Sequence, residues 1–78
     1  MDKRIKTIMS IIFEIPVDEI NEETSKEKVK TWDSLKHMDL VVALEEDFSI
    51  EFNDDEIIML DSFSAIKKIL GKKMDEIN

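Results

Sequence analysis

Apolar residues recur at helical spacing near the start of the chain and predict a first helix there. Four of them lie three or four residues apart, as on one buried helix face: Ile5, Ile8, Met9 and Ile12. Asp2 is a candidate cap for the start of this helix. Pro16 disfavours helical geometry at Ile15 and therefore ends the helix.

A second helix is predicted from Ser34 to Phe48, and it carries two apolar stripes. The first stripe, which His37 joins at its start, faces the predicted core and consists of Leu40, Val41, Leu44 and Phe48. The second stripe lies roughly 140° away around the helix. It consists of Leu35, Met38 and Val42, and it is flanked by Asp39, Glu45 and Glu46. Two interpretations stay open: both stripes are buried, or the second stripe is an exposed strip with an acidic rim that binds a partner.

Two further helices complete the pattern. Asn53, with Glu56 three residues later, predicts a capping box at the start of a short helix. Asp61 or Ser62 caps the last helix, in which four apolar residues share one face: Phe63, Ile66, Ile69 and Leu70. Gly71 is the single glycine of the chain and is predicted to mark the end of this helix.

Residues 17–32 separate the first two helices and are mostly polar. We interpret them as a long loop with a helical turn near Val17–Ile20, pinned by scattered apolar side chains: Val17, Ile20, Val29 and Trp32. A loop of this length is uncommon in a compact domain unless it is functional. The predicted fold is all-α, a small four-helix bundle with three longer helices, one short helix and this loop. At 78 residues, the chain has room for one domain, residues 1–78.

Composition narrows the class of protein further. Apolar residues make up 42% of the chain and charged residues 38%. This composition is too charged for a membrane span and too apolar for a disordered tail. The absence of cysteine excludes a disulfide framework and a cysteine-based metal site. Residues 1–16 have spaced apolar positions and no small-residue cleavage site, unlike a signal peptide. We therefore expect a cytoplasmic monomer that does not insert into membranes.

The net charge of −8 comes from one part of the chain. Residues 33–61 hold ten acids and one base, Lys36, whereas acids and bases nearly balance over residues 1–32. Nucleic-acid binding is excluded, because phosphate contacts need Lys and Arg. A protein partner should instead carry a basic surface.

Ser34 occupies a special position at the start of the second predicted helix. Asp33 serves as the N-cap, which leaves Ser34 in the first turn with a free hydroxyl. The helix dipole and the free N–H groups there would support a phosphate ester on Ser34. Ser34 is poorly equipped as a catalytic nucleophile, because His37 lies on the core side and no glycine-rich oxyanion turn is present. We predict no catalytic residues and no enzyme activity.

A calcium-binding module is a further class to consider, because "FNDDEIIMLDSF" is rich in acids. Calcium loops of the EF-hand type alternate oxygen ligands around a central glycine. This segment has neither feature. We therefore predict no metal site. An acidic helical protein-interaction module without a prosthetic group stays open as an alternative, and it would give Ser34 no special status.

The tripeptide Asp33-Ser34-Leu35, followed by "DLVVALEEDFSIEF", resembles the attachment site and second helix of acyl carrier proteins. The similarity extends over nearly the whole chain. It includes the first amphipathic helix, the long loop ending at Asp33, "NDDEI" and a terminal helix with "AIKKIL". The tripeptide alone would be a weak signal, whereas the full set of features is much more specific.

The resemblance implies that Ser34, next to Asp33, receives 4′-phosphopantetheine from coenzyme A. A separate phosphopantetheinyl transferase attaches it with Mg²⁺, and the thiol of the arm holds acyl or aminoacyl groups as thioesters. The protein would present them to acyl-loading and biosynthetic enzymes with basic docking patches, in fatty-acid, polyketide or other specialised biosynthesis. The partner-facing positions of the family match Asp33, Leu35, Met38, Val42, Glu45 and Glu46, with Asp39 on the same rim.

Three features depart from general fatty-acid carriers. Trp32 precedes Asp33, Lys36 follows Leu35, and the loop has "SKEKVKT" in place of the usual leucine before the motif. "WDSL" is more similar to dedicated carriers, and Lys36 would weaken docking on general partners that expect an acid there. We interpret Trp32 as a loop plug over the core. His37 is interpreted as a hydrogen-bonded side chain at the edge of the bundle.

Overall fold

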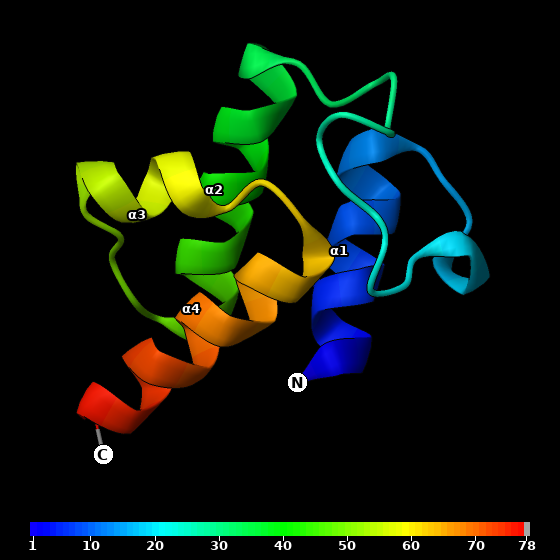
Figure 1. Cartoon of the computed structure of the whole chain (residues 1–78). Helices are drawn as coiled ribbons and strands as arrows, with labels where there is room; N and C mark the ends of the chain where they lie inside the picture. Colours follow the sequence, from blue (N-terminus) through cyan, green and yellow to red (C-terminus); the bar gives the residue numbers. More distant parts are fainter. Residues whose placement is uncertain (78) are drawn as a thin grey trace.

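A computed structural model describes residues 1–77, with side chains as far as Asp75. Four α-helices follow one another along the chain: α1 (Asp2–Phe13), α2 (Ser34–Phe48), α3 (Asp54–Met59) and α4 (Phe63–Ile77). A 3-10 turn, η1 (Val17–Glu19), lies in the loop between α1 and α2. Within residues 1–77 there is no strand, only an isolated bridge between Ser25 and Ser62. The predicted all-α bundle of three longer helices and one short helix is confirmed (Figure 1).

The helices enclose one hydrophobic core. α1 packs against α2 and α4, and α3 packs against α4 (Figure 1). The fully buried side chains come from three helices, the long loop and the residue that follows α3: Ile5, Met9, Phe13, Ile20, Leu40, Val41, Leu44, Leu60, Phe63, Ile66 and Leu70. No helix within residues 1–77 combines the length and the apolar character that crossing a membrane requires.

The two ends of α1 differ in how well the sequence predicts them. Asp2 is the first helical residue and Met1 takes the N-cap position without a side-chain hydrogen bond, so the predicted capping role of Asp2 is wrong. The first N–H groups of a helix lack partners within the helix, and here no side chain caps them. At the other end Glu14 adopts a left-handed backbone conformation with φ of 59°. The helix therefore ends before Ile15 and Pro16, as predicted.

The long loop is pinned to the bundle by part of the predicted set of side chains. Ile20 and Trp32 are buried. Val17 is 42% exposed, so its predicted role in pinning the loop is wrong, although η1 confirms the helical turn predicted there. The Thr31 hydroxyl donates a hydrogen bond to the Phe13 carbonyl at 2.7 Å, which ties the end of the loop to the end of α1.

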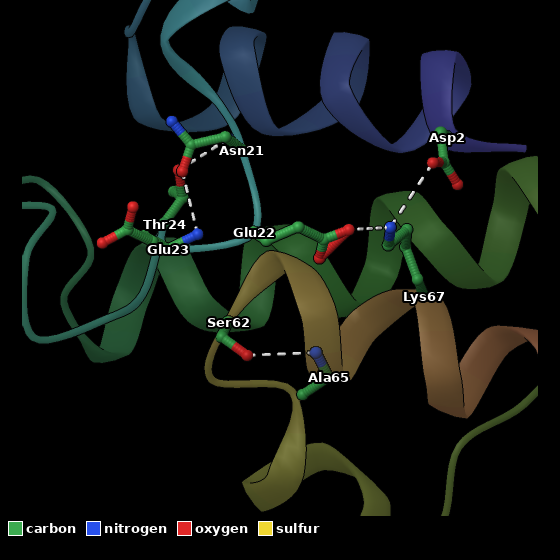
Figure 2. A network of polar contacts seen from close by, with 8 residues as sticks. All are labelled: Asp2, Asn21, Glu22, Glu23, Thr24, Ser62, Ala65 and Lys67. Atoms are coloured by element: carbon green, nitrogen blue, oxygen red, sulfur yellow. Dashed lines mark hydrogen bonds and ion pairs between the residues drawn. The ribbon is translucent and has the colours of Figure 1, made fainter.

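Backbone hydrogen bonds also join the loop to the start of α4. The Lys26 N–H donates to the Asp61 carbonyl at 2.8 Å, and the Phe63 N–H donates to the Thr24 carbonyl at 3.0 Å. Side chains join the same elements. Figure 2 shows the Lys67 ammonium of α4 in contact with Glu22 of the loop and with Asp2 of α1. The hydrogen bond to Glu22 is the main cause that raises the pKa of Lys67. These contacts fix the loop before it reaches Ser34.

The short helix α3 begins with the predicted capping box. The Asn53 side chain accepts from the Glu56 N–H at 2.8 Å, and the Glu56 carboxylate accepts from the Asn53 N–H at 2.9 Å. Lys73 of α4 forms an ion pair with Glu56 at 2.9 Å. The hydrogen bond from Lys73, and then that from the Asn53 N–H, lowers the pKa of Glu56. The capping box of α3 is thereby also connected to α4.

The predicted end of the last helix at Gly71 is wrong, because α4 continues to Ile77. Gly71 is half-buried and does not adopt the positive φ of a glycine cap. Glycine in a helix interior costs about 1 kcal/mol relative to alanine, which is not enough to break a helix that is held by packing. That packing continues past Gly71, because Met74 is four residues beyond Leu70 and also packs against the core.

Candidate functional site

Ser34 is the first residue of α2 and its side chain is exposed. The preceding residue, Asp33, caps the helix as predicted: its carboxylate accepts a hydrogen bond from the Lys36 N–H at 2.8 Å. No hydrogen bond engages the Ser34 hydroxyl within the part of the chain that the structure describes. Asp33 thus caps the helix, and Ser34 keeps a free hydroxyl at the positive end of the helix dipole.

A second Asp-Ser-apolar triplet, at Asp61-Ser62-Phe63, shows why the position of Ser34 matters. Here Ser62 itself is the cap, because its hydroxyl accepts from the Ala65 N–H at 3.0 Å (Figure 2). This settles the choice that the sequence left open between Asp61 and Ser62. Two similar triplets therefore place their serines differently, one as an occupied cap and the other, Ser34, as a free group.

The second stripe of α2 is exposed to solvent. Leu35 is 73% exposed, Met38 47% and Val42 48%. The first stripe is buried, as predicted, together with His37. Of the two interpretations that the sequence left open, the structure therefore supports the exposed strip. The strip begins directly after Ser34 and follows the outer face of α2.

The acids beside the second stripe differ in what their side chains do. Asp39 and Glu46 are exposed. Glu45 is half-buried, and its carboxylate accepts a hydrogen bond from the Phe52 N–H at 2.9 Å. Glu45 therefore holds the segment that leads from α2 to α3, a structural task that its position in the helix pattern did not reveal. Asp39 and Glu46 form the freely accessible part of the acidic rim.

The structure exposes two further large apolar residues, on α3, that the sequence pattern did not single out. Ile58 and Met59 of α3 are 73% and 57% exposed. α3 has only six residues, so its spacing does not define a face in the way that a longer helix does. Leu60, directly after the helix, is fully buried and anchors it.

Trp32 and His37 lie on the inner side of Ser34 and both are buried. The Trp32 ring stacks on Phe13 with ring centroids 4.4 Å apart, which confirms that Trp32 covers the core. His37 has hydrogen-bond partners for both ring nitrogens, as its interpretation as a satisfied side chain requires. Lys36 is half-buried, and its ammonium lies 3.9 Å from the carboxylate of Glu14, the residue that follows α1.

The acidic segment 33–61 meets bases from both ends of the chain. Arg4 of α1 forms an ion pair with Asp47 of α2 at 2.9 Å, and Lys73 pairs with Glu56. The Arg4–Asp47 pair is exposed, and exposed pairs contribute about 1 kcal/mol or less, whereas the Lys73–Glu56 pair is largely covered. No group of three or more histidine and acidic side chains among the described residues is arranged to hold a metal ion.

Comparison with known proteins identifies the class to which this arrangement belongs. No family model matches the chain. The chain is, however, 33% identical over 78 residues to the acyl carrier protein of Buchnera aphidicola subsp. Schizaphis graminum (strain Sg), an alignment that covers all of this chain and 90% of that protein. The chain therefore belongs to the acyl carrier protein family. This membership and the helical bundle agree with a protein that carries acyl groups and is not itself a catalyst.

Proposed function

We propose that Ser34 carries 4′-phosphopantetheine and that this protein holds acyl or aminoacyl groups as thioesters on that arm. The observation that carries the proposal is the free, exposed hydroxyl of Ser34 directly after the Asp33 cap, in a chain of this family. The Ser34 oxygen would form a phosphate ester with the phosphopantetheine moiety of coenzyme A. The pyrophosphate bond breaks, adenosine 3′,5′-bisphosphate leaves, and the hydroxyl proton passes to a base of the transferase.

The residues around Ser34 fit a phosphodiester. The first turn of α2 has unpaired N–H groups and the positive end of the helix dipole, both of which favour an anion. When bound, the arm supplies a thiol, which this chain lacks because it has no cysteine. Residues 1–78 would act as one carrier domain and as a monomer, with the chemistry performed by partner enzymes.

The second stripe and its rim are proposed as the docking surface for these partners. An exposed apolar strip with accessible acids suits an enzyme surface that combines an apolar centre with basic residues. The strip consists of Leu35, Met38 and Val42, and the acids near it are Asp33, Asp39, Glu45 and Glu46. The phosphopantetheinyl transferase and the acyl-loading enzymes would bind the same face, because Ser34 lies at its end.

Charge reversal on this rim tests the docking proposal. Asp39→Lys with Glu46→Lys is expected to weaken binding to the transferase by slowing association, and the loss should shrink at high salt because exposed charges are screened. Glu45 is left unchanged, since it holds the Phe52 N–H. Association rates measured at low and high ionic strength give the result, and Asp18→Lys with Glu19→Lys in η1 is the matched control. Equal losses of association rate in both double variants would mean that binding depends on net charge alone and not on the position of the acids.

Two residues close to Ser34 in the sequence favour a dedicated carrier over a general fatty-acid carrier. Trp32 is a buried plug directly before Asp33, and Lys36 places a base in the first turn of α2. A base at this position opposes a basic partner patch that expects an acid. We propose that the chain serves its own loading enzyme in a specialised pathway.

An intact-mass measurement tests attachment. The purified protein, incubated with coenzyme A, Mg²⁺ and a broad-specificity phosphopantetheinyl transferase, is expected to gain the mass of one phosphopantetheine group. No gain would favour the alternative function, an acidic helical interaction module without a prosthetic group. The same helices, charge and exposed strip would serve that module, so modification is the property that separates the two.

A further inference from the structure

A chain of hydrogen bonds crosses the bundle beside Ser34. The Trp32 indole Nε1–H donates to His37 Nδ1 at 3.0 Å, and His37 Nε2 lies 2.7 Å from the Ile57 carbonyl oxygen of α3. Since Nδ1 accepts from the indole, the proton of the neutral imidazole is on Nε2, which donates to Ile57. We call these three groups the indole–imidazole bridge. It joins the loop, α2 and α3.

The bridge lies on the inner side of α2 beside Ser34, the proposed attachment site of the cargo. His37 follows Ser34 by three residues, so the two side chains are neighbours on α2. Ser34 is exposed to solvent, whereas His37 is buried. Trp32 precedes Ser34 by two residues and is 3% exposed. The Trp32 ring also stacks on Phe13 of α1. The space between the beginning of α2 and the end of α3 is therefore occupied by a polar contact that is also packed against α1.

An alkyl chain could pass here only by breaking the bridge. Separation of α2 from α3 would break the contact between His37 Nε2 and the Ile57 carbonyl and leave the imidazole N–H without a partner, although the Leu60 N–H would still donate to that carbonyl. A hydrocarbon offers no hydrogen bonds in exchange, and buried polar groups without partners are costly. The buried polar side-chain atoms of the described residues all have partners in the closed bundle. The closed state is therefore favoured for apolar cargo as well as for the unloaded protein.

We propose that the indole–imidazole bridge keeps the bundle closed beside Ser34, so that this carrier holds short or polar acyl groups in solvent and does not shelter a long alkyl chain between its helices. The inference rests on the proposed attachment at Ser34 and names the class of cargo for that site. Polar or small cargo needs no apolar shelter, whereas an unsheltered long chain would expose hydrocarbon to water.

Chain-length dependence tests the inference. The transferase is supplied with acetyl or octanoyl coenzyme A, and the melting temperatures of the two loaded proteins are compared. The wild-type forms should melt at the same temperature, and their thioesters should react with hydroxylamine at equal rates. An octanoyl form that melts several degrees higher, or that is protected from hydroxylamine, would overturn the inference.

Two variants show whether the bridge is the cause. His37→Ala removes its centre, and Trp32→Phe keeps an aromatic ring against Phe13 while removing the N–H donor. In both, the octanoyl form should now melt several degrees above the acetyl form. Ile11→Ala, on the exposed face of α1 and outside the proposed docking surface, is the matched control and should behave as wild type. No chain-length effect in a folded bridge variant would show that the bridge does not close the bundle.

The two proposals fail in different ways. If Ser34 is not the attachment site, no phosphopantetheine mass appears on it with any donor, and the inference about cargo falls together with the proposed function. If attachment occurs and the wild-type octanoyl form is stabilised, only the inference about cargo is wrong. Intact mass before each melt therefore assigns the result to one proposal.

Discussion

Ser34→Ala is expected to gain no phosphopantetheine at all while its helical fold stays intact. Alanine has no oxygen with which to form the phosphate ester. The fold should be unaffected, because the Ser34 side chain is exposed and Asp33 provides the cap of α2. Alanine is also the best helix former, so the melting temperature should be equal or slightly higher. Intact mass after transferase treatment, with circular dichroism on the same sample, gives both results.

Ser64→Ala is the matched control for this experiment. Ser64 is also exposed and also lies in the first turn of a helix, α4, so it has the same kind of local surroundings as Ser34. Its alanine variant should gain the full mass. Ser62 is less suitable, because its hydroxyl caps α4 and its loss would destabilise the protein. Modification that persists in Ser34→Ala would place the attachment site elsewhere.

Leu44→Ala should strongly destabilise the protein, whereas Met38→Ala and Val42→Ala should not. Leu44 is fully buried in the core, and truncation of a buried leucine costs about 2–5 kcal/mol through lost burial and the cavity that remains. Met38 and Val42 are each about half exposed, so their truncations should stay within about 1 kcal/mol. Denaturant melts of the three variants, with the slope checked for constancy, measure these differences.

The size of the effect at Leu44 matters for a protein of this length. Stabilities of about 0.05–0.15 kcal/mol per residue are usual, so the loss at Leu44 is a large share of the total. Leu44→Ala is expected to be partly unfolded well below the melting temperature of the wild type. Similar losses at Met38 and Leu44 would contradict the exposed position of the second stripe and would remove it as a docking surface.

The parts of this protein that its sequence determines alone depend on contacts within a turn or two of helix. The caps at Asp33 and Asn53 are of this kind, because each accepts a hydrogen bond from an N–H three residues later. Apolar spacing located the core faces of the helices for the same reason. The free position of Ser34 follows directly, since it depends only on Asp33 acting as the cap.

Tertiary structure decided the features that depend on neighbours distant in the sequence. The two stripes of α2 have similar apolar character, and only the packing of α1 and the other helices leaves Leu35, Met38 and Val42 exposed. Gly71 could end a helix, but α4 continues beyond it because Met74 packs against the core.

Tertiary structure also decided which side chains have structural partners. Glu45 looks like a surface acid until its hydrogen bond to the Phe52 N–H is known, and His37 looks like an edge residue until Trp32 and Ile57 are placed around it. Local spacing specifies which face of a helix a residue occupies. Whether that face is covered, and by which group, is decided by segments that only folding brings together.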